Sequence, residues 1–128
     1  MGIPILCDIC TVQPNIHLQF LRQTLLPIPG VTERPCYGTP GFYAGKKMFA
    51  RMKEDGKTLV IQSFEREKWM DKDPDIFFIT DHYLNYDYVL IDLEKVEQAD
   101  LMSLLLTAYC NQATAKLIRE FESNLKII

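Results

Sequence analysis

Residues 73–93 read Asp-Pro-Asp-Ile-Phe-Phe-Ile-Thr-Asp-His-Tyr-Leu-Asn-Tyr-Asp-Tyr-Val-Leu-Ile-Asp-Leu. Two runs rich in β-branched and aromatic residues, 76–80 and 86–93, flank a polar segment at residues 81–85. Runs of this kind, bounded by polar turn residues, predict two neighbouring β-strands joined by a short elbow. We expect the rest of the chain to support or cover this pair of strands.

Outside this pair, the sequence predicts helices and a three-stranded meander. Apolar residues at helical spacing predict helices at residues 15–26, 64–71 and 97–125, the last in one or two pieces. Three strands are predicted between the first two helices, at residues 42–43, 46–53 and 58–63, after a stretch rich in Pro and Gly. The expected order is α-βββ-α-ββ-α. This order indicates an α+β fold with an antiparallel sheet of about five strands and helices mainly on one face.

The composition is that of one globular domain. The chain has 128 residues, of which 48% are hydrophobic and 24% charged, and a core of this size needs no metal or disulfide for stability. The net charge of −3 argues against a protein that wraps nucleic acid or coats an anionic membrane. No apolar run approaches the length of a membrane span, and the first residues lack the pattern of a secretory leader. We expect a soluble, cytoplasmic protein.

The first 14 residues contain a Cys-x-x-Cys pair, Cys7 and Cys10. This spacing suits a redox pair at the start of a helix, or half of a zinc site if a second pair follows. The remaining cysteines, Cys36 and Cys110, are isolated. We therefore favour a third interpretation, a chance pair in an N-terminal tail, and expect no metal or cofactor. Residues 1–14 are assigned to this tail and residues 15–128 to a single domain.

The strand at residues 46–53 alternates in sequence. Met48, Ala50 and Met52 share one side, which we assign to the core. The other side and its neighbours form a candidate nucleic-acid-binding face: Lys46, Lys47, Phe49, Arg51, Lys53 and Lys57. Cations along a strand, with an aromatic ring among them, suit weak and sequence-tolerant contact with a phosphate backbone. Alternatively, this face is solvated, or is paired with the acidic segment at residues 71–100.

The elbow between the two central strands is a second candidate site. We expect aromatic and polar side chains to line a pocket there, with Arg51 beside them: Tyr37, Asp81, His82, Tyr83, Tyr86 and Tyr88. Alternatively, Asp81 and His82 hydrogen-bond the turn while Tyr83 packs on the sheet edge. Adjacent residues at a strand end point to opposite sides, so Asp81 and His82 form no direct catalytic dyad. Because the sequence also lacks the common catalytic motifs, we expect no enzyme.

Short motifs in a consistent order resemble the MmcQ/YjbR family. They lie at residues 26–33 (Leu-Pro-Ile-Pro-Gly-Val-Thr-Glu), 37–40 (Tyr-Gly-Thr-Pro), 45–51 (Gly-Lys-Lys-Met-Phe-Ala-Arg), 54–56 (Glu-Asp-Gly), 73–83 and 89–93 (Val-Leu-Ile-Asp-Leu). The resemblance extends over about residues 26–121 and implies a fold similar to that of the bacterial frataxin homologue. It also implies a DNA-binding role.

The chain departs from the family at the elbow. After Leu84-Asn85 it has Tyr86 and Asp87, where many members carry Lys-Arg, so two positive charges are missing there. The first helix has no carboxylate for frataxin-like iron binding. We expect a weak, non-sequence-specific DNA-binding or regulatory module. The alternative is an interaction module for a small molecule or another protein at His82. The uneven charge also favours a homodimer, and no membrane partner is expected.

Overall fold

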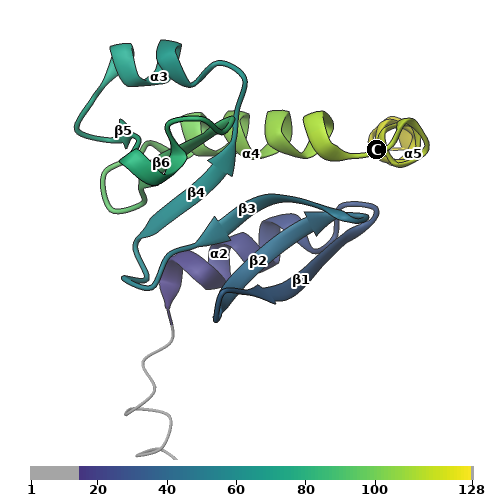
Figure 1. Cartoon of the computed structure of the whole chain (residues 1–128). Coiled ribbons are helices and arrows are strands. Elements are labelled where there is room, and N and C mark those ends of the chain that lie inside the picture. The colour runs from purple at the N-terminus through teal and green to yellow at the C-terminus, as the bar shows by residue number, and fades with distance from the viewer. Residues whose placement is uncertain (1–14, 128) are drawn as a thin grey trace, which may run out of the picture.

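The computed structural model describes residues 15–127, so the Cys7 and Cys10 pair lies outside the described residues. Figure 1 shows an antiparallel sheet flanked by helices. The elements in chain order are α2 (Ile16–Leu25), β1 (Val31–Cys36), β2 (Thr39–Ala44), β3 (Lys47–Met52), β4 (Thr58–Gln62), α3 (Arg66–Lys72), β5 (Phe77–Phe78), the 3₁₀ turn η1 (Asp81–Tyr83), β6 (Tyr88–Asp92), α4 (Gln98–Gln112) and α5 (Ala115–Ile127). The predicted α+β fold is confirmed.

The sheet has six strands in the order β1-β2-β3-β4-β6-β5. The additional strand is β1, which lies in the Pro- and Gly-rich stretch where no strand was predicted. It pairs with β2 along its whole length, from Val31 opposite Ala44 to Cys36 opposite Thr39. As β1 is the edge strand, Pro35 can stand in it without breaking an interior ladder. The Pro and Gly content of this stretch therefore led the prediction to omit a regular strand.

The two central strands are neighbours, as predicted, with β6 between β4 and β5. The first is much shorter than residues 76–80, since only Phe77 and Phe78 pair with β6. The residues before β5 form a turn, in which the N–H groups of Ile76 and Phe77 both donate to the carbonyl of Asp73. The elbow that follows is the single 3₁₀ turn η1.

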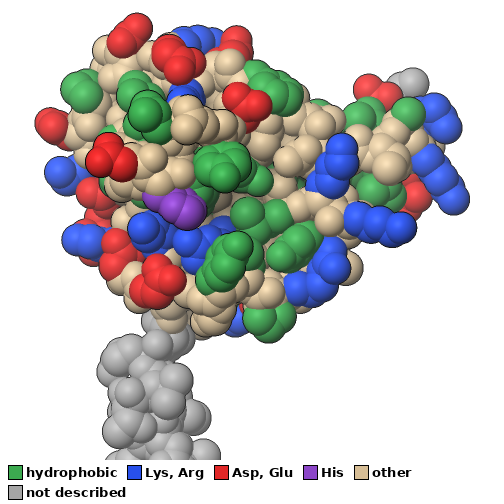
Figure 2. Space-filling view, viewed as in Figure 1, with side chains coloured by type: hydrophobic (Ala, Val, Ile, Leu, Met, Phe, Trp, Pro, Cys, Tyr) green, Lys and Arg blue, Asp and Glu red, His purple; other side chains and the backbone are tan. Residues whose placement is uncertain are grey.

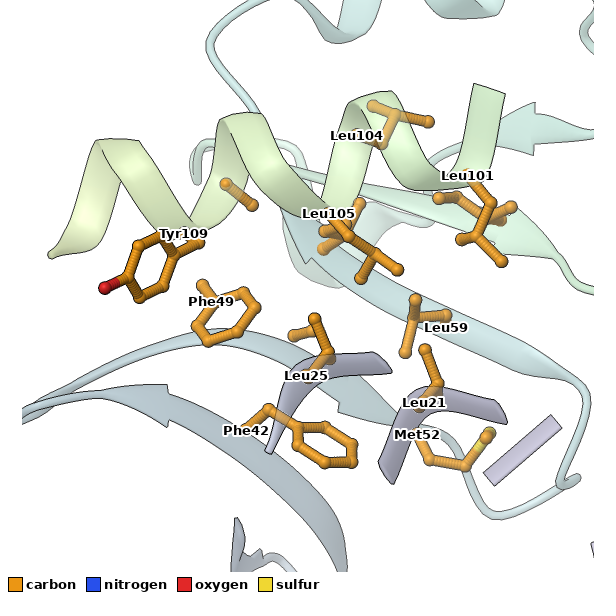
Figure 3. Close-up of a cluster of buried hydrophobic side chains, with 14 of the residues drawn as sticks. Leu21, Leu25, Phe42, Phe49, Met52, Leu59, Leu101, Leu104, Leu105 and Tyr109 are labelled. Atoms are coloured by element: carbon orange, nitrogen blue, oxygen red, sulfur yellow. The ribbon is translucent and has the colours of Figure 1, made fainter. Parts of the chain in front are cut away.

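The hydrophobic core lies between one face of the sheet and the helices α2 and α4 (Figure 3). Helix α4 buries Leu101, Leu104, Leu105 and Ala108, which recur at the helical spacing expected from the sequence, and α2 contributes Leu21 and Leu25. Burying one such side chain contributes about 1.5–3 kcal/mol. No helix within residues 15–127 combines the length and apolar character needed to cross a membrane.

Strand β3 departs from regular alternation. Phe42 pairs with Ala50 and Tyr43 pairs with Met48, so Phe49 is an extra residue that forms a β-bulge. Both Phe49 and Ala50 are fully buried in the core, whereas Met48 and Arg51 lie on the opposite face of the sheet. The assignments of Met48 to the core and of Phe49 to the cationic face were therefore wrong. The bulge reverses the alternation within the strand.

Helices α4 and α5 are separate. The chain is extended at Ala113, and Figure 1 shows α4 from the side but α5 end-on. The hydroxyl group of Tyr109 in α4 donates to the carbonyl of Pro29 at 2.7 Å. Leu117 in the first turn of α5 fills the space beside Gly30, where a Cβ atom would lie 2.5 Å from Leu117 Cδ1. The Leu117 side chain thus places the start of α5 beside the residue that precedes β1, and the Tyr109 hydrogen bond ties α4 to the same segment.

We predict that Gly30→Ala destabilises the protein more than Gly38→Ala. Both glycines have positive φ, but Gly38 has open space around it, so its substitution costs only the left-handed strain of about 1–2 kcal/mol. The clash with Leu117 should add about 1 kcal/mol at Gly30. Urea unfolding of both variants, with and without Leu117→Ala, measures the difference. A gap that persists in the Leu117→Ala background would contradict this packing of α5.

Candidate functional site

An open pocket of about 330 Å³ lies on the sheet face opposite the helices. We call it the aromatic pocket. Its lining residues are Cys36, Tyr37, Met48, Arg51, His82, Tyr83, Tyr86 and Tyr88. They come from the β1–β2 hairpin, β3, the elbow and β6. The structure thus brings together five of the six side chains assigned to a pocket from the sequence, and Arg51. The exception is Asp81, which is not part of the lining.

Arg51 is the charged group at the base of the pocket, with only 7% of its surface exposed. Its guanidinium donates to Thr39 Oγ1 at 2.8 Å and to the Tyr83 hydroxyl at 3.3 Å. Burial lowers the pKa of Arg51, but the interactions with Tyr83 and with Glu54 raise this pKa more, and the net shift is upward. The side chain therefore stays charged.

The charge of Arg51 is weakly compensated. Among the described residues, its ion-pair partner is Glu54, at 3.8 Å, and the Glu54 side chain is 65% exposed. An ion pair with a solvated carboxylate at this distance contributes little. A nearly buried cation without a close counter-ion is costly, and it favours an anion that enters the pocket.

Aromatic rings form the walls of the pocket. The rings of His82 and Tyr83 meet edge to face with centroids 4.7 Å apart, and the Tyr83 and Tyr88 centroids are 6.0 Å apart. Burial raises the pKa of Tyr88, so its hydroxyl group stays protonated. Tyr37 is 88% exposed and has a φ of 52°, a left-handed conformation that is uncommon outside glycine. Its ring lies 5.8 Å from the Arg51 guanidinium carbon.

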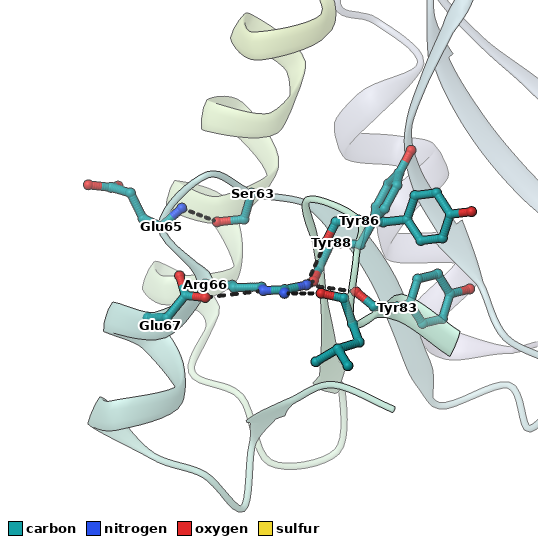
Figure 4. A network of polar contacts seen from close by, with 8 residues as sticks. Ser63, Glu65, Arg66, Glu67, Tyr83, Tyr86 and Tyr88 are labelled. Carbon is teal, nitrogen blue, oxygen red and sulfur yellow. Dashed lines mark hydrogen bonds and ion pairs between the residues drawn. The ribbon is translucent and has the colours of Figure 1, made fainter. Parts of the chain in front are cut away.

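Arg66 holds the elbow in place (Figure 4). Its guanidinium donates to the carbonyl groups of Tyr83 at 2.8 Å, Leu84 at 2.8 Å and Tyr88 at 3.1 Å, and also to that of Tyr86. One side chain at the start of α3 thus ties together the segment that carries most of the pocket wall. No pattern in the sequence indicates this role, because a single arginine at the start of a helix is common.

One histidine, His82, lines the aromatic pocket. His82 lies against the rings of Tyr83 and Tyr86, and within the described part of the chain no carboxylate lines the pocket. Residues 15–127 also contain no group of three or more His, Cys, Asp or Glu side chains that could hold a metal ion. What the pocket does offer is binding chemistry, with one buried cation surrounded by aromatic surface.

The predicted nucleic-acid-binding face does not form as one surface. The β-bulge buries Phe49 completely and turns Arg51 into the aromatic pocket. Lys57 pairs with Glu94 at 3.8 Å beyond the far end of β3, where Lys53 is also located. Of the six residues, only Lys46 and Lys47 remain together and exposed.

A different group of cations gathers around the β2–β3 turn. The Arg34 guanidinium donates to the carbonyl of Gly45 at 2.9 Å, and a Cβ atom at Gly45 would lie 3.8 Å from Leu117 Cδ1 of α5. We call this group the basic edge, and it consists of Arg34, Lys46, Lys47, Lys116 and Arg119. All five are exposed, and none forms an ion pair with another described residue. Figure 2 shows Lys and Arg side chains along this side of the molecule and onto α5, and many Asp and Glu side chains at the other end.

We predict that Arg66→Lys loosens the elbow. Lysine cannot reproduce the planar set of donors, so several carbonyl groups lose their partner, and the loss should cost about 2 kcal/mol. Amide hydrogen exchange should accelerate at Leu84 and Tyr86, whose N–H groups close turns within the elbow.

Arg22→Lys is the matched control, because Arg22 makes a two-bond pair with Glu33 that is partly exposed, with 46% of the Arg22 side chain and 22% of the Glu33 side chain accessible. It should cost at most about 1 kcal/mol and leave exchange in the elbow unchanged. Equal effects of the two substitutions would show that Arg66 is not the anchor of the elbow.

Comparison with protein families gives a match to the YjbR family over residues 26–111. The matched range begins after α2 and runs almost to the end of α4, so it includes the whole sheet, the aromatic pocket and the sheet part of the basic edge. Comparisons with curated proteins and with solved structures found no significant match. The resemblance recognised in the sequence motifs is confirmed, and the chain belongs to the YjbR family.

Proposed function

We propose that this YjbR-family protein is a nucleic-acid-binding module that holds DNA along the basic edge, weakly and without sequence specificity. Binding rather than catalysis is the proposed activity. The observation that carries the proposal is the gathering of exposed cations from three separate segments. Arg34 comes from β1, Lys46 from the β2–β3 turn and Lys47 from the start of β3, and Lys116 and Arg119 from α5.

The basic edge suits contact with phosphates rather than with bases. Its side chains are long and exposed, and none forms an ion pair with another described residue. Arg34 is held by the carbonyl of Gly45 and stacks over the Tyr43 ring at 3.9 Å, so the other four side chains are the ones that can move to meet phosphate oxygens. Contacts of this kind position a protein on DNA but do not read the sequence. Each cation that neutralises a phosphate releases counterions, which makes the affinity fall steeply with salt.

The departure from the family pattern at the elbow does not remove this surface. Tyr86 and Asp87 stand between η1 and β6, whereas the basic edge is built from β1, the β2–β3 turn with the start of β3, and α5. The net charge of −3 opposes association with DNA from a distance, and this repulsion supports the expectation of weak binding. Because the rest of the protein is negatively charged, it also favours one orientation on DNA, with the basic edge facing the duplex.

We predict that fluorescence anisotropy detects binding to a labelled random duplex at about 50 mM salt, and that affinity falls by about a hundredfold at about 200 mM salt. Lys46→Gln/Lys47→Gln should weaken binding at the lower salt concentration by about tenfold, because two phosphate contacts are lost.

Lys68→Gln/Lys95→Gln is the matched control. It removes the same charge from two exposed lysines of α3 and of the segment before α4, and it should change the affinity by less than about threefold. Absence of binding at low salt would contradict the proposal. So would equal losses in the two double variants, since these would reflect net charge alone.

A further inference from the structure

We propose that the aromatic pocket is a binding site for a small planar ring that carries one anionic group. The anion contacts the Arg51 guanidinium, and the ring packs among the tyrosines. This site is distinct from the DNA-binding surface proposed above, because no residue of the basic edge lines the pocket. The inference therefore goes beyond nucleic-acid binding and can fail independently of it.

The charge of the ligand follows from Arg51. A guanidinium has five N–H donors, and Thr39 and Tyr83 accept from two of its nitrogens. Arg51 is therefore oriented but not saturated. A carboxylate or phosphate oxygen that enters the pocket would gain a charge-assisted hydrogen bond in a largely buried place, where such bonds are strong. A neutral ligand would forgo this gain, and a cation would be repelled.

The shape of the ligand follows from the walls. A volume of about 330 Å³ is at the lower end for ligand pockets, and it suits about one or two fused rings. Tyr37 and Tyr86 leave 88% and 58% of their surfaces exposed, so their rings are available for stacking rather than used in the core. Exposed aromatic side chains that gather around one cavity mark a binding surface.

The pocket is also pre-organised. Arg66 anchors the carbonyl groups of Tyr83, Tyr86 and Tyr88, and the hydroxyl group of Tyr83 in turn accepts from Arg51. Tyr37 is held in a left-handed backbone conformation, which costs a non-glycine residue about 1–2 kcal/mol. Strain that holds an exposed ring beside a buried cation is typical of a functional position. A ligand would therefore meet walls that are already in place.

Three compounds with the same ring test the charge requirement: indole-3-acetate, indole-3-acetamide and tryptamine, which are anionic, neutral and cationic. We predict that indole-3-acetate binds at least about tenfold more tightly than the amide, and that tryptamine binds more weakly still. Titrations of ¹⁵N-labelled protein followed by NMR measure the affinities. They should show the largest shifts at Tyr37, Arg51 and Tyr83.

Two variants test the location. Tyr37→Asn removes the ring while keeping a residue that tolerates the left-handed conformation, and it should weaken indole-3-acetate binding by about fivefold or more. Ile16→Ala is the control, because Ile16 is 75% exposed on α2 and does not line the pocket. This variant should bind indole-3-acetate with the affinity of the wild type. This pair avoids the unfolding that substitution of the buried Arg51 could cause.

Equal affinity for the three compounds, or shifts centred outside the pocket, would overturn the inference. Lys46→Gln/Lys47→Gln separates it from the proposed DNA binding, since this variant should bind indole-3-acetate as the wild type does. If the double variant loses indole-3-acetate together with DNA, the anion is held by the basic edge and the pocket assignment fails. If only DNA binding fails, the assignment of the pocket stands.

Discussion

The β-bulge at Phe49 decides which side chains of β3 reach the core and which reach the opposite face. With Phe42 paired to Ala50 and Tyr43 paired to Met48, the strand places Phe49 against Tyr109, with ring centroids 6.0 Å apart. The same irregularity places Met48 and Arg51 together in the aromatic pocket. A regular strand would have left Arg51 beside Phe49 on one face. The core and the candidate ligand site thus depend on one extra residue.

Two arginines then hold the elbow in place on the sheet face opposite the helices. Arg66 fixes the backbone of the elbow through four carbonyl groups, and Arg51 fixes the Tyr83 side chain that the elbow presents. Arg66 has its donors occupied by the protein, which gives it a structural role. Arg51 keeps unoccupied donors and a weakly compensated charge, so it is suited to a ligand.

Hydrophobic patterning predicted the fold well because most elements bury one regular face. The apolar positions of α4 and the neighbouring placement of β5 and β6 followed directly. Strand β1 was missed because an edge strand tolerates Pro35. The bulge was missed because alternation assumes one residue per pairing position. The tyrosines near His82 were predicted to gather in one pocket, whereas the basic edge depends on how α5 packs on Gly30 and Gly45, which no local pattern encodes.

The most direct test of this account is a measurement of NOEs from the side chains of Phe49 and Met48. The bulge predicts NOEs between the rings of Phe49 and Tyr109, and between the Met48 methyl group and the tyrosines of the aromatic pocket. Regular alternation would predict the opposite, with the Met48 methyl group close to α4 and the Phe49 ring close to Tyr88. If NOEs of this second kind were observed, β3 would contain no bulge. The pocket around Arg51 would then no longer exist in the form described.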